Sequence, residues 1–365
     1  MISRLLVTLL ISPLLALSTL SASADYQLET VAEDLNFPWS VAFLPEGELL
    51  VATRPGQLLR VSSTGAVSEP LSGTPATLVE SQGGYFDILL DSNFAENQTV
   101  YLSFAWGTLD ANGTRIVKAR LGAQGFEDTE ILFTVSPLKA AGAHFGGRMV
   151  ELADGTLLLA TGDGFDYREA AQDTFSQLGK ILRLNKDGTA PSDNPFADGT
   201  AGDPYVWSYG HRNTQGLVVD SNTGIVYNHE HGPQGGDEIN RIEKAKNYGW
   251  PAITYGINYS GAYVSPFQSA PGMERPLKYW VPSIAPSGFA LYQGDAFPDW
   301  RGDLFIGTLV NNEVRRVDLE DGQLVAEESL FAELDARIRD VRVGPDGYLY
   351  LLTDSATGKL IRVKP

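Results

Sequence analysis

The sequence predicts an all-β protein, a six-bladed β-propeller made of four-stranded antiparallel blades. One observation is a repeated pattern in which alternating apolar segments are separated by turns rich in Pro, Asp and Gly, as in β-hairpins. The pattern occurs six times at spacings of roughly 45 to 80 residues, within reach of propeller blades that carry loop insertions. A second observation is the near absence of helical periodicity. A β-sandwich with repeated hairpins is the alternative.

The elements follow from this pattern in chain order. Apolar stretches that open the six copies are expected at Val41, Ile88, Met149, Leu217, Phe297 and Val341. Residues 26–31 also alternate, and we expect them to complete the last blade and so protect sheet edges that would otherwise pair with other chains. Two stretches interrupt the repeat, residues 168–204 and 250–287. Both are predicted to be long loops, where binding sites are often built.

The first residues have the features of an export signal. Arg4 is followed by an apolar stretch and then by the small residues at 22–24, as a signal peptidase requires. We therefore expect residues 1–24 to be a signal peptide cleaved near Ala24, and residues 25–365 to be the propeller domain of a periplasmic or secreted protein. An uncleaved membrane anchor is the alternative, but no later stretch approaches the ~20 apolar residues of a spanning helix. Insertion into a membrane is not expected.

Composition excludes several classes of function. The chain of 365 residues has a net charge of −18, so nucleic acid and anionic membrane surfaces would be repelled. It contains no Cys, which excludes thiol catalysis, sulfur-bound zinc and a disulfide framework. With only four His, an enzyme built on this chain has few general bases available.

Two glycine-rich segments place polar side chains beside predicted inner strands. Residues 142–148 surround His144 with glycines, and an imidazole that titrates near neutrality suits proton abstraction. The alternative is a hydrogen-bonded loop histidine. Residues 210–216 contain Arg212, whose planar fork suits carboxylate or carbonyl oxygens, and Asn213, which both donates and accepts. A surface ion pair is the alternative for Arg212.

A third segment, residues 229–238, allows two kinds of metal site. His229 and His231 flank a glutamate and would share one face of a strand, an arrangement that can bind a transition metal but lacks an evident third ligand. Gly232 and Pro233 instead offer free backbone carbonyls, which suit calcium. We favour calcium.

A fourth segment carries two arginines at strand spacing. Arg337 and Arg339 are expected to point the same way, which is costly in a channel unless an anion lies there. In so acidic a protein, the pair indicates a small polyanionic ligand. The alternative is local pairing with carboxylates such as Asp335 and Asp340.

Together these segments resemble the soluble quinoprotein glucose and aldose sugar dehydrogenases, the glucose/sorbosone dehydrogenase family. The resemblance covers essentially the whole chain after the signal peptide, and its specificity comes from the joint order of the motifs. These motifs are Phe-Pro-Trp at 37–39, Gln-Gly-Gly at 82–84, His-Phe-Gly-Gly-Arg at 144–148, Gly-Asp at 162–163, Gly-His-Arg-Asn-Thr-Gln-Gly at 210–216, His-Gly-Pro at 231–233 with Asp-Glu at 237–238, Asn-Tyr-Gly-Trp-Pro at 247–251 and Arg-Ile-Arg-Asp at 337–340.

The resemblance implies a six-bladed propeller that holds pyrroloquinoline quinone (PQQ) and a calcium ion over the channel mouth. His144 would remove the proton of the C1 hydroxyl of an aldose sugar while hydride passes from C1 to the quinone, giving a lactone. Asp163 would orient His144. The remaining implied contacts are Gln82 beside the sugar, Arg212 on the quinone oxygen that gains charge, Asn213 beside the cofactor, Arg337 and Arg339 on its carboxylates, and the carbonyls of Gly232 and Pro233 on calcium.

Two departures from the family pattern matter. Val310 stands where family members commonly have a Lys that contacts the cofactor carboxylates, and Ala143 stands where some glucose dehydrogenases have Asp. The second departure favours a broad aldose specificity. Two other functions remain open, a propeller metallohydrolase such as a lactonase and a non-catalytic propeller that binds sugars or proteins. The chain is expected to be a monomer or homodimer, and its electron acceptor is not indicated.

Overall fold

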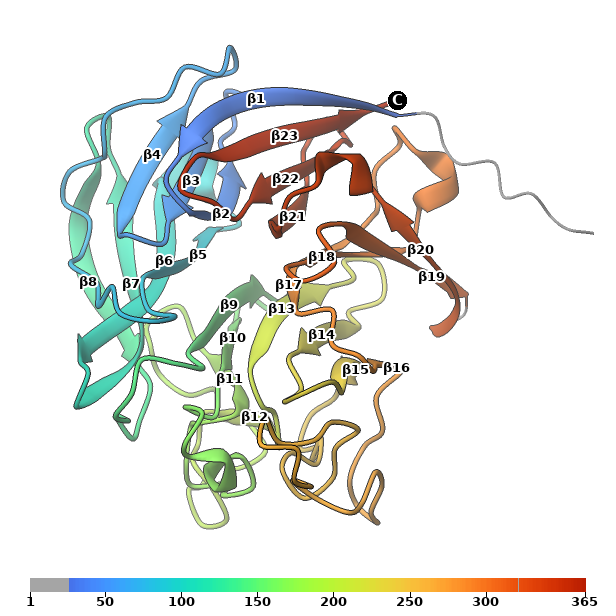
Figure 1. The fold of residues 1–365 in the computed structure, drawn as a ribbon. Coiled ribbons are helices and arrows are strands. Elements are labelled where there is room, and N and C mark those ends of the chain that lie inside the picture. The colour runs from blue at the N-terminus through green and yellow to red at the C-terminus, as the bar shows by residue number, and fades with distance from the viewer. Residues whose placement is uncertain (1–25, 321) are drawn as a thin grey trace, which may run out of the picture.

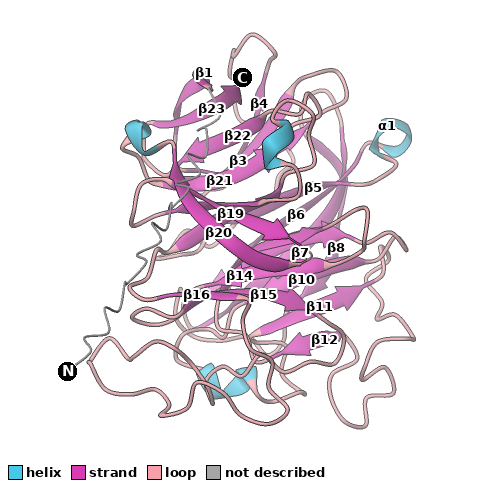
Figure 2. Ribbon diagram, turned by 90° about the vertical axis from the view of Figure 1, so that its right-hand side faces the viewer, coloured by secondary structure: helices cyan, strands magenta, loops and turns pink. Residues whose placement is uncertain are grey.

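The structure is a computed structural model that describes residues 26–320 and 322–365, so the predicted signal peptide lies outside the described residues. Six antiparallel sheets are arranged around a central axis (Figure 1). Strands form most of the body, and helix is confined to short segments near its edges (Figure 2). None of the helices in these two ranges is long and apolar enough to span a membrane. The predicted six-bladed propeller is confirmed.

The strands follow one another blade by blade. The first blade consists of β2 (Pro38–Phe43), β3 (Leu49–Thr53) and β4 (Gln57–Val61), and the second of β5 (Tyr85–Leu90), β6 (Thr99–Thr108), β7 (Ala111–Leu121) and β8 (Phe126–Thr134). The third consists of β9 (Gly146–Glu151), β10 (Leu157–Thr161), β11 (Lys180–Leu184) and β12 (Val206–Tyr209), and the fourth of β13 (Thr214–Val219), β14 (Val226–Glu230), β15 (Asp237–Ile242) and β16 (Lys278–Trp280). The fifth consists of β17 (Pro286–Leu291), β18 (Leu304–Thr308), β19 (Val314–Glu320) and β20 (Gln323–Leu330). The last sheet is β21 (Ile338–Val343), β22 (Leu349–Thr353), β23 (Gly358–Lys364) and β1 (Gln27–Leu35). The short helices are α1 (Phe94–Asn97), η1 (Arg168–Ala171), η2 (Pro298–Trp300) and η3 (Ala332–Leu334).

The ring closes in the way the sequence predicts. The inner strands β2, β5, β9, β13, β17 and β21 each contact the next one around the axis, and β21 contacts β2 (Figure 1). The first described strand, β1, pairs antiparallel with β23, with Gln27 opposite Lys364. The two ends of the chain therefore share one blade, and the closed ring leaves each inner strand covered on both sides.

One blade differs from the predicted four strands. The sheet β2–β3–β4 has three strands. Within the described residues, the chain between β4 and β5 makes two isolated bridges in place of a fourth strand, one between Val61 and Val67 and one between Ser72 and Gly125. This segment contains Pro70 and Pro75, and proline cannot donate to a strand ladder. It still covers the blade, because Leu71 donates its N–H to the carbonyl of Leu58 and its side chain is buried.

The core is a set of apolar layers between neighbouring blades. One layer joins Leu50 and Leu58 of the first blade to Ile88 and Leu102 of the next, and equivalent clusters lie between other blades. Strands in the middle of a blade are consequently buried on both faces, as all five residues of β10 are. Burying such faces at about 25 cal/mol per Å² of apolar surface makes interblade packing the main stabilising contribution.

Three predictions about segment boundaries are wrong. The fifth copy does not open at Phe297, which precedes η2, because the inner strand of that blade is β17. Its Gly288 packs so closely on the neighbouring inner strand that a Cβ there would lie 2.2 Å from the backbone nitrogen of Val341. The predicted loop 168–204 contains η1 and the fully buried strand β11, and the predicted loop 250–287 contains β16. Short strands of mixed polarity between glycines and prolines resemble loops when only the sequence is read.

Candidate active site

A cavity of about 240 Å³ lies at the face of the propeller where the inner strands begin. It collects six of the nine predicted site residues in its lining, namely Gln82, His144, Arg212, Asn213, Arg337 and Arg339. The other three lie around it: Asp163 contacts His144, the carbonyl of Gly232 contacts Arg212, and Pro233 lines an adjoining hollow together with Arg212. Segments more than 250 residues apart in the chain thus meet at one site.

His144 and Asp163 form a buried hydrogen-bonded pair. Nδ1 of His144 lies 2.6 Å from Oδ1 of Asp163, and both residues are almost fully buried. Burial lowers the pKa of His144 below its usual value, despite the opposing effect of Asp163. Burial alone would raise the pKa of Asp163, but the hydrogen bond from His144 and the charge of Arg212 lower it overall. The expected state is a neutral imidazole with its proton on Nδ1, which leaves Nε2 free to accept a proton.

The backbone around His144 is held in an uncommon conformation. His144 has φ of 52°, in the left-handed region that non-glycine residues seldom adopt. Oε1 of Gln82 accepts the main-chain N–H of His144 at 2.9 Å, and Gly162 passes so close that a Cβ there would lie 2.1 Å from the His144 carbonyl. Gln82 therefore both lines the cavity and fixes the loop that presents the imidazole.

Asp163 also connects His144 to Trp250. Its Oδ2 accepts the indole N–H of Trp250 at 2.8 Å, and its Oδ1 accepts the main-chain N–H of Phe165 at 2.8 Å. Three donors on one carboxylate stabilise its ionised form. Trp250 belongs to the predicted loop 250–287 and to the Asn-Tyr-Gly-Trp-Pro motif at 247–251, but the sequence analysis assigns it no role at this site.

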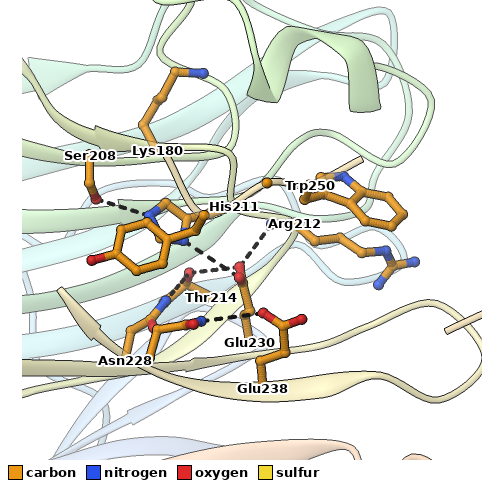
Figure 3. A network of polar contacts seen from close by, with 12 residues as sticks. Lys180, Ser208, His211, Arg212, Thr214, Asn228, Glu230, Glu238 and Trp250 are labelled. Carbon is orange, nitrogen blue, oxygen red and sulfur yellow. Dashed lines mark hydrogen bonds and ion pairs between the residues drawn. The ribbon is translucent and has the colours of Figure 1, made fainter. Parts of the chain in front are cut away.

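Arg212 lies between a buried polar network and the cavity (Figure 3). Its main-chain N–H donates to Oε2 of Glu230 at 2.8 Å, whereas its guanidinium extends beside Trp250, 5.2 Å from the ring centre. Nη1 donates to the carbonyl of Gly232 at 2.6 Å and to that of His231 at 3.1 Å. The buried Nε has no hydrogen-bond partner among the described residues. A guanidinium held in this way retains donor capacity for a ligand.

The network behind Arg212 consists of buried groups with structural partners. His211 contacts Ser208 through Nε2 at 2.9 Å and lies 3.5 Å from Glu230 through Nδ1 (Figure 3). Glu238 faces Glu230 across β14 and β15, and burial followed by the Glu230 charge raises the pKa of Glu238 well above its usual value. This network sets the position of the Arg212 backbone and does not line the cavity.

Arg337 and Arg339 point to the same side, as predicted, and their shared partner is Asp354. Oδ2 of Asp354 accepts from Nη2 of Arg337 at 2.9 Å and from Nη2 of Arg339 at 3.0 Å. The alternative of pairing with a local carboxylate is therefore realised, but through Asp354. Asp340 pairs with other arginines, and Asp335 has no ion pair within the described ranges. Counting outward from the turn of the β21–β22 hairpin would have placed Asp354 beside the pair, since Ile338 is opposite Thr353.

The two histidines of the third segment are not arranged as metal ligands. Nε2 of His231 lies 2.6 Å from the carbonyl of Pro286, and Nε2 of His229 lies 3.4 Å from that of Gly288. Across residues 26–320 and 322–365, no three His, Asp or Glu side chains form a group that could hold a metal ion. Backbone carbonyls therefore remain the protein ligands that this segment could offer to a cation.

Two further residues near the site escaped the sequence analysis. Arg54, in the turn directly after β3, lines the cavity. Lys139 is buried, and its Nζ lies 3.8 Å from the ring centre of the cavity-lining Phe145. Its Nζ also donates to Oδ1 of Asn112 and to the carbonyl of Ala141, at 2.8 Å each. Burial lowers the pKa of Lys139 to about 8. Neither residue belongs to a glycine-rich segment, the pattern that marks His144 and Arg212 in the sequence.

Comparison with known proteins gives a consistent assignment. Residues 35–362 match the family described as Glucose / Sorbosone dehydrogenase. Aldose sugar dehydrogenase YliI of Escherichia coli (strain K12) is 38% identical over 361 residues, which cover 97% of each chain.

Solved structures agree with this match. The apo-form of the soluble aldose sugar dehydrogenase from Escherichia coli superposes with a TM-score of 0.90 at 38% identity, covering 93% of this chain and 100% of that one. The PQQ-bound form of aldose sugar dehydrogenase from Streptomyces coelicolor superposes with a TM-score of 0.75 at 27% identity, covering 94% and 99%. These neighbours have the same propeller fold over almost their full length.

Proposed function

Because the chain belongs to the glucose/sorbosone dehydrogenase family, we propose that it oxidises the C1 hydroxyl of aldose sugars to lactones, with PQQ as cofactor and calcium beside it. The observation that carries this proposal is the His144–Asp163 pair, which lies at a cavity lined by four arginines. The cavity would then combine a base that accepts the substrate proton with a binding site for an anionic oxidant. We further propose that the chain acts in the periplasm or outside the cell, after removal of residues 1–24.

His144 is the proposed general base. Oxidation of a C1 hydroxyl removes a proton from oxygen and a hydride, with its electron pair, from carbon. Nε2 of His144 takes the proton, and Asp163 stabilises the imidazolium that results because its carboxylate already accepts the Nδ1 proton. The proton is then released to solvent, which returns His144 to its neutral form.

The arginines fit an anionic cofactor. Buried Nε atoms of Arg212 and Arg339 lack hydrogen-bond partners within the described chain, and guanidinium groups match carboxylate oxygens in geometry. Arg337 and Arg339 would hold the carboxylates of PQQ, and Arg212 would donate to the quinone oxygen that becomes negative. When bound, PQQ supplies the quinone that accepts the hydride. Asn213, which lines the same cavity, would lie beside it.

Calcium would be bound by the protein through backbone oxygens alone. The proposed ligands are the carbonyls of Gly232 and Pro233, oxygen donors of the kind that this hard ion prefers. The Gly232 carbonyl already accepts from Arg212 at 2.6 Å, so a cation there would compete with the guanidinium for this oxygen. When bound, calcium acts as a Lewis acid toward the quinone.

The proposal is tested by adding PQQ and calcium to the purified apoprotein and measuring dye reduction with several aldoses. We expect sugar-dependent reduction with more than one aldose, together with bleaching of the cofactor absorbance when sugar is added. Lactone hydrolysis is measured in parallel. Protein that binds PQQ but shows no sugar-dependent reduction would overturn the proposal, and lactone hydrolysis in its place would indicate a metallohydrolase.

A further inference from the structure

Arg54 occupies a fixed position at the cavity that no predicted role explains. Its main-chain N–H donates to the carbonyl of Phe37 at 2.9 Å, and its carbonyl accepts the N–H of Tyr85 at 3.3 Å. Gly84 lies directly against it, since a Cβ at Gly84 would be 2.0 Å from the Arg54 carbonyl oxygen. Two blades thus hold the Arg54 backbone, and its side chain lines the same cavity as Arg337 and Arg339.

The guanidinium of Arg54 has an aromatic neighbour but no acidic one. It lies 4.3 Å from the ring centre of Phe37, a cation–π distance, and no carboxylate of the described residues lies within ion-pair distance of it. Arg60, on the next strand of the same blade, is different, because its Nη1 pairs with Glu48 at 2.9 Å. The charge of Arg54 is therefore available to a ligand, whereas that of Arg60 is satisfied by the protein.

The cavity as a whole has an excess of positive charge. Four arginines line it, Arg54, Arg212, Arg337 and Arg339, and Asp354 is the one carboxylate within the described ranges that pairs with any of their guanidinium groups. A chain with a net charge of −18 has many carboxylates that could have neutralised them. Like charges gathered in a concave site favour an anion of more than one charge.

We propose that Arg54 is a further anion-binding residue of this cavity and binds a carboxylate of the polycarboxylate cofactor together with Arg337 and Arg339. This inference rests on the proposed function, because it takes PQQ as the anion. Val310 follows the cavity-lining Leu309 and is 61% exposed, so it offers the ligand no charge on the side of Arg337. Arg54 supplies a charge on the side of the first blade.

The test measures the affinity of the full-length apoprotein for PQQ by quenching of tryptophan fluorescence, which Trp39 in the cavity lining reports. Loss of one charge-assisted hydrogen bond predicts that Arg54→Gln binds roughly 10- to 100-fold more weakly. It also predicts a smaller dependence of binding on salt concentration. Arg60→Gln is the matched control and should bind as the wild type does.

The outcomes separate the two proposals. Wild-type protein that does not bind PQQ would reject the proposed function, and this inference with it. Wild-type protein that binds PQQ, with an Arg54→Gln variant of equal affinity and equal salt dependence, would reject this inference alone.

A second measurement avoids any effect of the substitution on folding. Saturating PQQ should protect Arg54 of the wild type, but not the equally accessible arginines far from the cavity, from modification by phenylglyoxal, as followed by mass spectrometry of its peptide. Equal modification of Arg54 with and without bound PQQ would overturn the proposal.

Discussion

Two groups of arginines on adjacent levels of the propeller differ in how they are paired. In the channel, Arg148 lies 2.9 Å from Asp340 and 3.4 Å from Asp87, and Arg342 lies 2.6 Å from Asp87 and 2.9 Å from Asp340. This channel network therefore balances two positive charges with two negative ones. The cavity level instead sets four arginines against the single paired carboxylate Asp354 among the described residues.

Charge balance distinguishes the two groups of arginines, whereas burial does not. Arg148 and Arg339 are both buried, and both lie near the ring of Trp39, at 4.2 and 5.9 Å from its centre. Arg148 has two carboxylate partners, so its charge joins three inner strands. Arg339 shares one carboxylate with Arg337, so the two carry a net charge that a ligand can neutralise.

Substitution of His144, the proposed general base, should have the largest effect. His144→Gln should lower the rate of sugar oxidation at saturating PQQ by about 10²- to 10⁴-fold, the usual contribution of a general base. The steady-state rate of dye reduction checks this. The unfolding temperature of the His144→Gln variant and its affinity for PQQ should stay close to those of the wild type. Full activity in this variant would show that the chemistry takes place elsewhere.

Breaking the channel network should affect stability more than ligand binding. Arg148→Met removes one partner from two buried carboxylates and should lower the free energy of unfolding by about 3–5 kcal/mol. Urea denaturation followed by circular dichroism measures the change. Arg339→Met is the matched variant at the cavity, expected to lose less stability but more PQQ affinity. If the two variants behaved alike, the distinction between the two levels would fail.

Acid pH should weaken the packing around the buried side chain of His229. Burial, followed by the charge of His231, lowers the pKa of His229 to about 3, whereas an unfolded histidine titrates near 6.5. The folded state thus binds fewer protons than the unfolded state between these values. The contribution is fully present above pH 6.5 and is lost as the pH falls toward 3, at up to about 1.4 kcal/mol per pH unit.

His229→Asn checks this pH dependence. Its free energy of unfolding, measured by urea denaturation from pH 7 to pH 4, should fall less steeply with acid than that of the wild type. Parallel slopes in the two proteins would contradict the assignment to His229.

The smallest effect is expected for an exposed ion pair. Lys118 and Glu130 lie 3.3 Å apart on neighbouring strands of the second blade, with side chains 33% and 61% exposed. Glu130→Gln should change the free energy of unfolding by less than about 1 kcal/mol. A decrease in the free energy of unfolding as large as that caused by Arg148→Met would mean that ion pairs in the channel stabilise the fold no more than exposed ones do.

Much of the architecture follows from local sequence. Turns such as Gly-Pro-Asp-Gly at 344–347 specify hairpins directly, and five of the six predicted repeat openings lie in inner strands. The remaining predicted opening, at Phe297, is wrong because the inner strand β17 begins with Pro-Ser-Gly, a composition typical of loops. The glycine of this segment, Gly288, is required by its close contact with Val341. This contact is between residues of different blades, so no local sequence pattern predicts it.

The class of the fold and the available chemical groups can be predicted from short segments, since hairpin turns, apolar alternation and motif order are local properties. Which charges neutralise one another depends on how the folded chain brings distant segments together. The tertiary structure pairs Asp340 with Arg148 and Arg342 and leaves Asp354 to the cavity arginines. The physical reason is that electrostatic interaction depends on distance in space, and the register of hairpins and the closure of the ring set that distance.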